Sequence, residues 1–412
     1  MRNYAIVTAA YWGFTLTDGA LRMLVLLHFF LLGFSPFTLA FLFVLYEAAG
    51  IVANLVGGWL AVRFGISRML MTGLGLQIAA FLFLSALDPG WGMALSVGWA
   101  VAAQGLAGIA KDLTKTASKS AIKLTAAEIA DGSAGNSRLF RWVAWFTGSK
   151  NAMKGVGFFL GGAALEVLGF RGALVAMAAA LALVLAGAAL SLPPLFGKAT
   201  PSRTARELFA KNRGVNLLAA ARIALFGARD VWFVVGLPVF LYGEGWSFAG
   251  VGLFLASWTI GYGAVQAAAP VLVRRSEDGL RREVPAARAW AAALAAIPAL
   301  LAAFLAAPTR LPPDIVVAAG LALFGIAFAV NSSLHSYLIL AYAGSEKAAE
   351  DVGFYYAANA AGRLLGTLAS GALTAAGGLT ACLAGSAFLL VVAAAVALLL
   401  PTALPARAAA AE

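Results

Sequence analysis

Nine charged side chains interrupt the long apolar segments of this sequence. They are the basic residues Arg22, Lys150, Lys154, Arg222, Arg229 and Arg363 and the acidic residues Asp18, Glu47 and Asp230. A charge at the centre of a bilayer costs about 2.5 to 3.5 kcal/mol even on the mildest insertion scales, so each is a candidate functional residue. If every carboxylate pairs with one cation, three positive charges remain. Such a surplus around a central cavity requires an anion, or lysines that lose their proton.

Helical spacing places several of these residues on common faces, because positions three, four or seven apart lie on one side of a helix. The pairs are Lys150 with Lys154, Arg222 with Arg229, and Asn359 with Arg363. Arginine presents a planar fork to two oxygens of a phosphate-like group, and lysine supplies a mobile point charge. The combination favours a tetrahedral oxyanion over a sugar or an apolar drug as the ligand.

Neutral polar residues in the same segments would exchange hydrogen bonds with hydroxyl or carboxylate groups of that ligand. The predicted substrate-binding set is Arg22, Lys150, Lys154, Arg229, Arg363, Asn331, His335, Tyr355, Tyr356 and Asn359. Some members have a plainer interpretation. His335 stands on a serine-rich face and is also typical of a packed polar residue, and the two tyrosines also fit ordinary packing.

The three acidic residues are expected to balance cations in the empty cavity or to couple transport to protons. Other interpretations remain open for two of them and for one arginine. Asp18 and Arg22 are four residues apart and also fit a local structural pair. Glu47 also fits a neutral carboxyl group that is hydrogen-bonded between helices, and Arg222 fits an anchor at the lipid headgroups.

Four lysines recur at every fourth position, at 111, 115, 119 and 123, and form a slowly drifting stripe on one helical face. One interpretation is a cytoplasmic helix near anionic lipid. The other extends the fourth membrane span, so that Lys111 and Lys115 form an entrance funnel that draws anions to the inner mouth.

Composition indicates the elements that position these residues. Of 412 residues, 62% are hydrophobic and 11% are charged, whereas about a quarter of the residues of a soluble domain are charged. Continuous apolar stretches of roughly 20 residues, rich in Ala, Leu and Gly, predict membrane helices and not barrel strands. Cys382 is the only cysteine, so we expect no disulfide, metal site or cofactor.

We therefore expect an all-α membrane protein with twelve transmembrane helices in two pseudo-symmetric six-helix halves. The predicted spans are 4–31, 37–62, 69–87, 93–114, 142–165 and 172–192, followed by 216–241, 248–273, 286–306, 315–341, 352–376 and 379–400. A polar, proline-containing segment separates the two groups and is typical of a cytoplasmic linker. The predicted division is 1–192, 193–215 and 216–412.

The basic residues outside the spans indicate the orientation. With the N-terminus inside, 21 of the 29 lysines and arginines are cytoplasmic and two, Arg171 and Arg310, are outside. This asymmetry predicts a multi-pass inner-membrane protein with both termini cytoplasmic. The net charge of +11 therefore reports topology, and nucleic acid is not an expected partner.

The two halves also repeat weakly, as the halves of many transporters do. Residues 33–37 match residues 245–248, so Ser35 corresponds to Ser247. Glycines follow Lys154 and Arg363 at the same offsets, three and eight residues later. This spacing predicts that Lys154 and Arg363 are symmetry mates.

The six-plus-six plan and the segment GGWLAVRFG at 57–65 resemble the major facilitator superfamily. More specifically, six blocks in order resemble the ArsJ family of organoarsenical efflux permeases over nearly the whole chain. They are YWGFTLTDGALRMLVLLHFF at 11–30, GIAKDLTKTASKSAIK at 108–123, TGSKNAMKGVGFFLGG at 147–162, FGARDVWFVVGLPVF at 226–240, FAVNSSLHSYLI at 328–339 and DVGFYYAANAAGRLLGT at 351–367.

This resemblance implies export of 1-arseno-3-phosphoglycerate by alternating access. A glyceraldehyde-3-phosphate dehydrogenase makes that compound from arsenate, and its release of arsenate after export would give arsenate resistance. The residues agree in chemistry, because the compound carries an oxyanion at each end and pentavalent arsenate behaves like phosphate. An organophosphate or phosphate exchanger remains the alternative. No nucleophile elbow, phosphate loop or metal-ligand cluster favours an enzyme, and the sign of the charges disfavours an exporter of cationic drugs.

Overall fold

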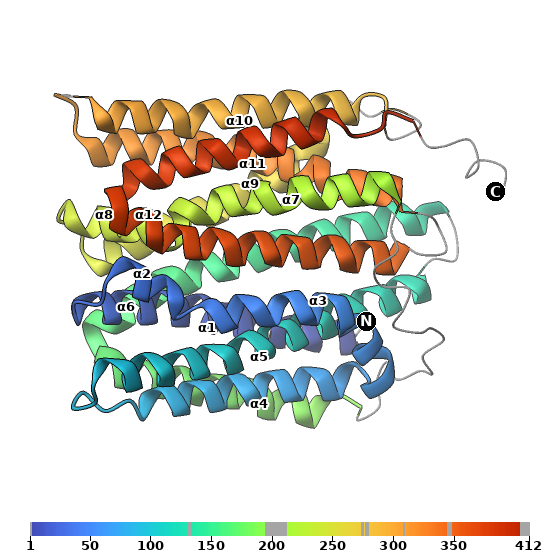
Figure 1. Ribbon diagram of the computed structural model, residues 1–412. Helices are drawn as coiled ribbons and strands as arrows, with labels where there is room; N and C mark the ends of the chain where they lie inside the picture. The colour runs from blue at the N-terminus through green and yellow to red at the C-terminus, as the bar shows by residue number, and fades with distance from the viewer. Residues whose placement is uncertain are drawn as a thin grey trace. The chain divides into compact units, whose positions relative to one another are not determined.

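The computed structural model describes residues 2–129, 133–193, 212–272, 276, 280–307, 310–343 and 348–403, and every regular element in these ranges is a helix. The first group is α1 (Arg2–Leu31), α2 (Pro36–Phe41), α3 (Val44–Phe64), α4 (Ile66–Ser85), α5 (Met93–Ile129) and α6 (Ser133–Ser191). The second is α7 (Arg213–Val231), the π-helical turn η2 (Trp232–Gly236), α8 (Leu237–Gly243), α9 (Phe248–Leu272), α10 (Glu283–Ala306), α11 (Pro313–Tyr342) and α12 (Ala348–Leu398) (Figure 1).

Ten of the described helical segments are long and apolar enough to cross a membrane. Two of them contain non-helical glycines, Gly169 in α6 and Gly377 with Gly378 in α12. Gly169 and Gly378 have positive φ angles, which glycine adopts without steric cost. The apolar segment on each side of these breaks is long enough for one membrane span of roughly 20 residues. If each broken helix is counted as two spans, the ten segments correspond to the twelve expected spans. The predicted all-helical membrane fold is confirmed.

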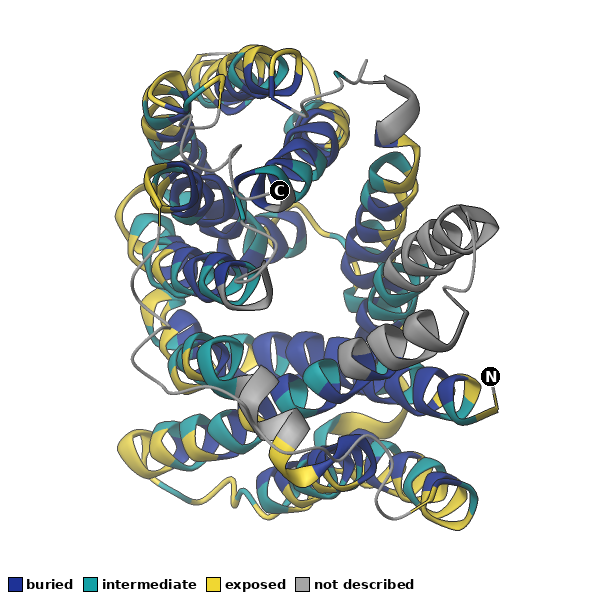
Figure 2. Ribbon diagram, turned by 90° about the vertical axis from the view of Figure 1, so that its right-hand side faces the viewer, coloured by how far each residue is buried: buried dark blue, intermediate teal, exposed yellow. Residues whose placement is uncertain are grey.

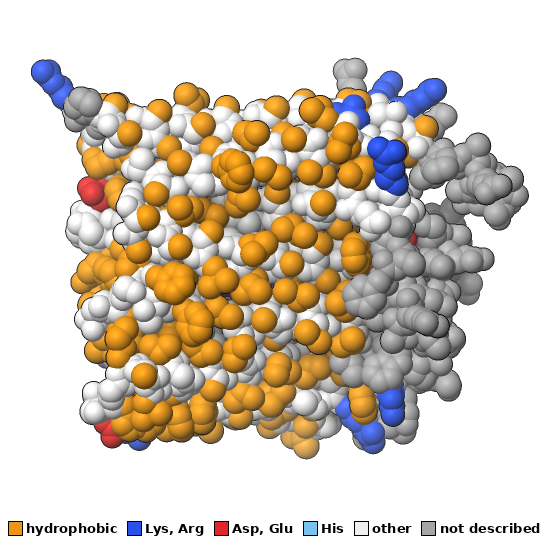
Figure 3. Space-filling view, in the orientation of Figure 1, with side chains coloured by type: hydrophobic (Ala, Val, Ile, Leu, Met, Phe, Trp, Pro, Cys, Tyr) orange, Lys and Arg blue, Asp and Glu red, His pale blue; other side chains and the backbone are white. Residues whose placement is uncertain are grey.

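Hydrophobic side chains cover the middle of the helices on the face seen in Figure 3, and lysines and arginines lie near the helix ends. Exposed positions follow one side of many helices, while buried positions follow the other (Figure 2). Apolar atoms that face outward are stable in lipid, so this pattern fits a protein surrounded by hydrocarbon.

The chain forms two compact units. The first contains Met1–Phe34, Phe41–Ser202 and Gly245–Gly263, and the second contains Ser35–Ala40, Arg203–Glu244 and Ala264–Glu412. Most of each predicted half falls within one unit, but most of α2 groups with the second unit and most of α9 groups with the first. The predicted division at 193–215 stays a prediction.

Glycines allow the closest helix contacts in each unit. In the first unit α6 packs on α1, and a Cβ atom on Gly157 or Gly161 would lie 2.2 or 2.4 Å from a backbone oxygen of α1. In the second unit α12 packs on α7, and a Cβ atom on Gly362 or Gly366 would lie 2.3 or 2.5 Å from a backbone oxygen of α7. Two small residues four positions apart are the usual means of close approach between membrane helices.

The two segments that group with the opposite unit, in α2 and α9, correspond to each other in the predicted repeat. Gly162 of α6 faces the backbone of Phe248 at the start of α9, and Gly371 of α12 faces the backbone of Pro36 at the start of α2. The preceding serines cap both helices, because Thr38 N–H donates to Ser35 Oγ at 3.2 Å and Gly250 N–H donates to Ser247 Oγ at 3.0 Å. The correspondence of Ser35 with Ser247 and of the glycines after Lys154 and Arg363 therefore has a structural counterpart.

A π-helical turn interrupts the predicted seventh span just after Arg229 and Asp230. Pro238, which follows this turn in α8, has no N–H to donate to the helix. The N–H groups of Val235 and Gly236 donate to Ser370 Oγ of α12 at 3.1 and 3.3 Å. A side chain of α12 thus satisfies the irregular backbone, and such turns often occur at functional sites.

Candidate functional site

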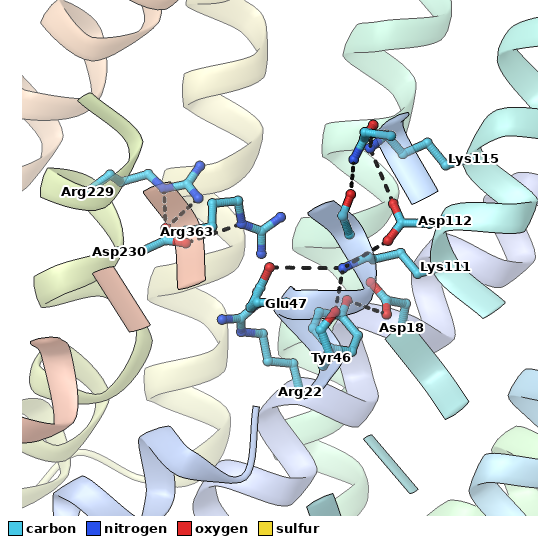
Figure 4. A network of polar contacts seen from close by, with 12 residues as sticks. Asp18, Arg22, Tyr46, Glu47, Lys111, Asp112, Lys115, Arg229, Asp230 and Arg363 are labelled. Carbon is cyan, nitrogen blue, oxygen red and sulfur yellow. Dashed lines mark hydrogen bonds and ion pairs between the residues drawn. The ribbon is translucent and has the colours of Figure 1, made fainter. Parts of the chain in front are cut away.

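Two arginines share one aspartate in the second unit. Asp230 of α7 accepts a hydrogen bond from Arg229 Nε at 2.6 Å through one carboxylate oxygen, and it pairs with Arg363 Nε of α12 at 3.2 Å through the other (Figure 4). Arg229 Nη2 also contacts Asp230. The Asp230 side chain is 1% exposed, whereas those of Arg229 and Arg363 are 15% and 18% exposed. We call these three residues the arginine site, and it carries one formal positive charge.

Arg222 lies two helical turns before Arg229 on α7 and has neutral partners. Its Nε donates to Asn359 Oδ1 at 3.0 Å, and its Nη1 donates to Ser332 Oγ at 3.1 Å and to the Ser332 carbonyl at 3.2 Å. Its guanidinium carbon lies 4.9 Å from the centre of the Tyr355 ring. Arg222 is 4% exposed, so its interpretation as a headgroup anchor is wrong.

Two of the neutral residues predicted on α11 and α12, Asn359 and Tyr355, contact this arginine. Asn331 and His335 are buried on α11, and Tyr355 is buried on α12. Tyr356 is partly buried and contacts the edge of the Tyr355 ring. Asn359 and Arg363 share one face of α12, but they contact different residues of α7. Asn359 contacts Arg222, and Arg363 contacts Asp230.

The first unit holds a network of opposite charges. Arg22 Nη1 of α1 pairs with Glu47 Oε1 of α3 at 3.0 Å, and Lys111 Nζ of α5 lies 4.0 Å from Glu47 Oε2. Asp18 Oδ1 accepts a hydrogen bond of 2.6 Å from the Tyr46 hydroxyl, and Lys111 lies 3.7 Å from the centre of the Tyr46 ring. The expected local pair of Asp18 with Arg22 is therefore wrong, and Glu47 faces two cations and not only neutral partners (Figure 4).

The same network continues along α5. Asp112 lies between two lysines, at 3.8 Å from Lys111 Nζ and 3.4 Å from Lys115 Nζ, and Lys115 donates to Asn54 Oδ1 of α3 at 2.9 Å. We call Asp18, Arg22, Glu47, Lys111, Asp112 and Lys115 the mixed-charge network. It contains three formal positive and three formal negative charges.

Sequence reasoning missed Asp112, and it also missed Tyr46, which binds Asp18, and Asn54, which binds Lys115. The signal was available for Asp112, because the predicted fourth span of 93–114 already includes it. The helix α5 continues to Ile129, which agrees with an extended fourth span. The function of Lys111 and Lys115 as an entrance funnel stays a prediction, and the side chains of Lys119 and Lys123 lie outside the described residues.

The two lysines predicted on one face of the fifth span lie on α6, and both are half-buried. Lys154 Nζ lies 5.7 Å from the centre of the Phe158 ring. Gly157, which packs on α1, follows Lys154 by three residues, and Gly366, which packs on α7, follows Arg363 by the same number. The two residues therefore hold matching positions in their units.

Buried ionisable residues on apolar helices, with an unequal balance of charge, define a class of protein: a multi-pass membrane transporter. Residues 4–350 match the Major Facilitator Superfamily. The chain therefore belongs to this family of transporters.

Solved structures support the same fold. The chain is similar to a POT family transporter crystallised with 5-aminolevulinic acid, with a TM-score of 0.73 and 14% identity, over 97% of this chain and 95% of the other. It is also similar to a mutant of the nucleoside transporter NupG, with a TM-score of 0.71 and 14% identity, over 97% of this chain and 100% of the other. Curated protein sequences gave no match. At this level of identity the similarity concerns the fold alone.

Proposed function

We propose that this transporter exports a phosphate-like organic anion by alternating access, with 1-arseno-3-phosphoglycerate as the substrate and arsenate resistance as the result. The observation that carries the proposal is the arginine site, where Arg229 and Arg363 share the single carboxylate of Asp230. Two guanidinium groups and one carboxylate leave a positive charge that an oxyanion would neutralise. The resemblance of the six sequence blocks to ArsJ permeases supports the arsenical compound in particular.

Asp230 has a function in the empty carrier under this proposal. Its carboxylate occupies the position that a substrate oxyanion would take, so it keeps the arginines neutralised while the protein returns without substrate. The substrate then displaces Asp230 from one or both arginines. Asp18 and Glu47 balance the cations of the mixed-charge network.

The membrane potential supplies the driving force in this proposal. The substrate carries about three negative charges near neutral pH, and moving each outward gains about 2.3 kcal/mol per 100 mV. Three charges would gain roughly 7 kcal/mol, enough for about a 10⁵-fold gradient at 1.4 kcal/mol per decade. We therefore propose a uniporter in the inner membrane with both termini cytoplasmic. The competing mechanism uses Asp18 as a proton carrier.

Everted membrane vesicles test the substrate. Glyceraldehyde-3-phosphate dehydrogenase, its substrate, NAD⁺ and arsenate are added outside, and we expect vesicles with the transporter to accumulate arsenic faster than vesicles without it. Arsenate without the dehydrogenase is the control and should give no difference. Equal accumulation with and without the dehydrogenase would contradict the organic substrate. Uptake that requires phosphate inside the vesicles would favour the alternative, an organophosphate or phosphate exchanger.

The same vesicles test the driving force when valinomycin and potassium set the potential at equal pH on both sides. Uptake should follow the imposed potential. Uptake that ignores the potential and responds only to a pH gradient would contradict the uniporter.

A further inference from the structure

Asn331 and His335 bury polar atoms that no described residue satisfies. Asn331 is 0% exposed, and neither atom of its side-chain amide has a hydrogen-bond partner in the described part of the chain. His335 is 1% exposed, and its Nδ1 atom has no such partner either. Buried polar groups without partners are rare and destabilising in folded proteins, so each requires a specific explanation.

The two residues share a face of α11 with a residue that binds Arg222. Asn331 and His335 are four positions apart, Ser332 is three positions before His335, and His335 lies between the other two in angle, so the three side chains are on one side of α11. Ser332 accepts two hydrogen bonds from Arg222 Nη1. A buried cation with neutral partners and two unsatisfied side chains therefore belong to one part of the second unit.

A single aromatic ring connects this part to the arginine site. The guanidinium carbon of Arg222 lies 4.0 Å from the centre of the Phe226 ring, and that of Arg229 lies 5.0 Å from the same centre. Each guanidinium group is close enough to the Phe226 ring for a cation–π interaction. The two guanidinium carbons are therefore at most about 9 Å apart. One short ligand with an anionic group at each end can contact both.

The chemistry of Asn331 indicates what lies beside the second anionic group. An amide presents donors on nitrogen and an acceptor on oxygen, and both are unsatisfied in Asn331. An oxyanion only accepts hydrogen bonds, so it would satisfy the nitrogen and leave the oxygen without a partner. A hydroxyl group donates and accepts, so it would satisfy both atoms.

We propose that Arg222, Asn331 and His335 form a second subsite, which binds the hydroxyl-bearing end of a short ligand whose other, more highly charged end lies at the arginine site. This proposal rests on the proposed function and adds to it the residues that recognise the hydroxyl group between the two anionic ends of the substrate. The subsite would distinguish such a substrate from phosphate alone and from the same compound without the hydroxyl.

Equilibrium binding to the purified full-length protein in detergent tests the subsite with three stable probes. They are 3-phosphoglycerate, its analogue without the 2-hydroxyl group, and inorganic phosphate. The wild type should bind 3-phosphoglycerate about tenfold more tightly than the deoxy analogue, as expected for one hydrogen-bonded group. Asn331→Leu should remove this preference and leave the affinity for inorganic phosphate unchanged. His335→Phe is a second variant and should reduce the preference in the same direction.

Two controls separate a ligand subsite from a structural function. Ser333→Ala changes a neighbouring α11 residue that donates to the Gln266 carbonyl at 3.4 Å, and it should keep the tenfold preference. Ligand-free Asn331→Leu should melt at or above the wild-type temperature, because it removes an unsatisfied buried amide.

The contrary outcomes are distinct. An unchanged preference for the hydroxyl in both Asn331→Leu and His335→Phe would overturn the subsite and leave the proposed function intact. Equal weakening of all three probes by Asn331→Leu, with a lower melting temperature, would assign it a structural function and also overturn the subsite. Failure of the wild type to bind any of the three probes would count against the proposed function itself.

Discussion

The two units treat buried charge in different ways. In the first, the mixed-charge network matches three cations with three carboxylates, and each lysine or arginine of the network contacts an acidic residue. In the second, Asp230 is shared by Arg229 and Arg363, and Arg222 has only neutral partners among the described residues. A network with equal numbers of cations and carboxylates needs no counter-ion, whereas a cationic one attracts an anion. From this difference we propose that the anion site lies in the second unit.

The largest effect should come from breaking the balance of the first unit. Glu47→Gln leaves Arg22 and Lys111 without their shared carboxylate, and Glu47 is 1% exposed. Removing one partner of a buried ion pair costs about 3 to 5 kcal/mol, so the melting temperature in detergent should fall strongly. The double variant Arg22→Met with Glu47→Leu removes both partners of the closest pair and should recover much of the loss. Equal loss in the single and double variants would show that the pair is not the cause.

The arginine site should depend on the shape of its cations as well as on their charge. Arg229→Gln should lower transport about 10- to 100-fold, because charge-assisted hydrogen bonds to a substrate oxyanion contribute about 1.5 to 3 kcal/mol. Arg229→Lys should fail nearly as badly, since lysine has no planar fork. Lys154→Arg in the first unit is the matched exchange and should retain partial transport in everted vesicles. Equal tolerance of both exchanges would indicate a diffuse potential without a shaped site.

A smaller effect should follow from changing the glycine contacts that hold the arginine site together. A Cβ atom on Gly366 would lie 2.5 Å from the Gly227 carbonyl oxygen, three residues before Asp230. Gly366→Ala should therefore destabilise the protein by about 1 to 3 kcal/mol, as overpacking does. Gly75→Ala on α4, where no atom lies within 4 Å, should be neutral or slightly stabilising. Equal melting temperatures of the two variants would contradict the close contact of α7 with α12.

Sequence reasoning predicted the membrane helices well because a bilayer allows few alternatives. Spans such as 248–273 and 315–341 agree with α9 and α11 to within a few residues. The breaks in the second and seventh predicted spans were not predicted, since they depend on tertiary contacts, such as the donation of Val235 and Gly236 N–H groups to Ser370. Helical periodicity gives the face of a residue within one helix and does not say which helix packs against it.

The same limit explains why the contacts within the candidate site could not be predicted from the sequence. Sequence reasoning identified Asp230, Arg229 and Arg363 as buried charges, but the sharing of one carboxylate depends on how α12 packs against α7. It also left open a local pair of Asp18 with Arg22 on one helix, whereas Tyr46 and Glu47 from α3 bind them. Spacing along one helix suggests partners within that helix, whereas residues of α1 and α7 also find partners on neighbouring helices.

The most direct test of the account is equilibrium binding of 3-phosphoglycerate to purified protein that carries one cation change in either unit. Arg363→Gln removes a cation from the arginine site, and Lys115→Gln removes one from the mixed-charge network, where Lys111 still contacts Asp112. We expect Arg363→Gln to weaken binding at least tenfold, because it removes a charge-assisted partner of the anion. We expect Lys115→Gln to change binding less than about twofold, because Lys115 does not belong to the arginine site. Equal weakening by the two variants, or a larger effect of Lys115→Gln, would contradict the assignment of the anion site to the second unit.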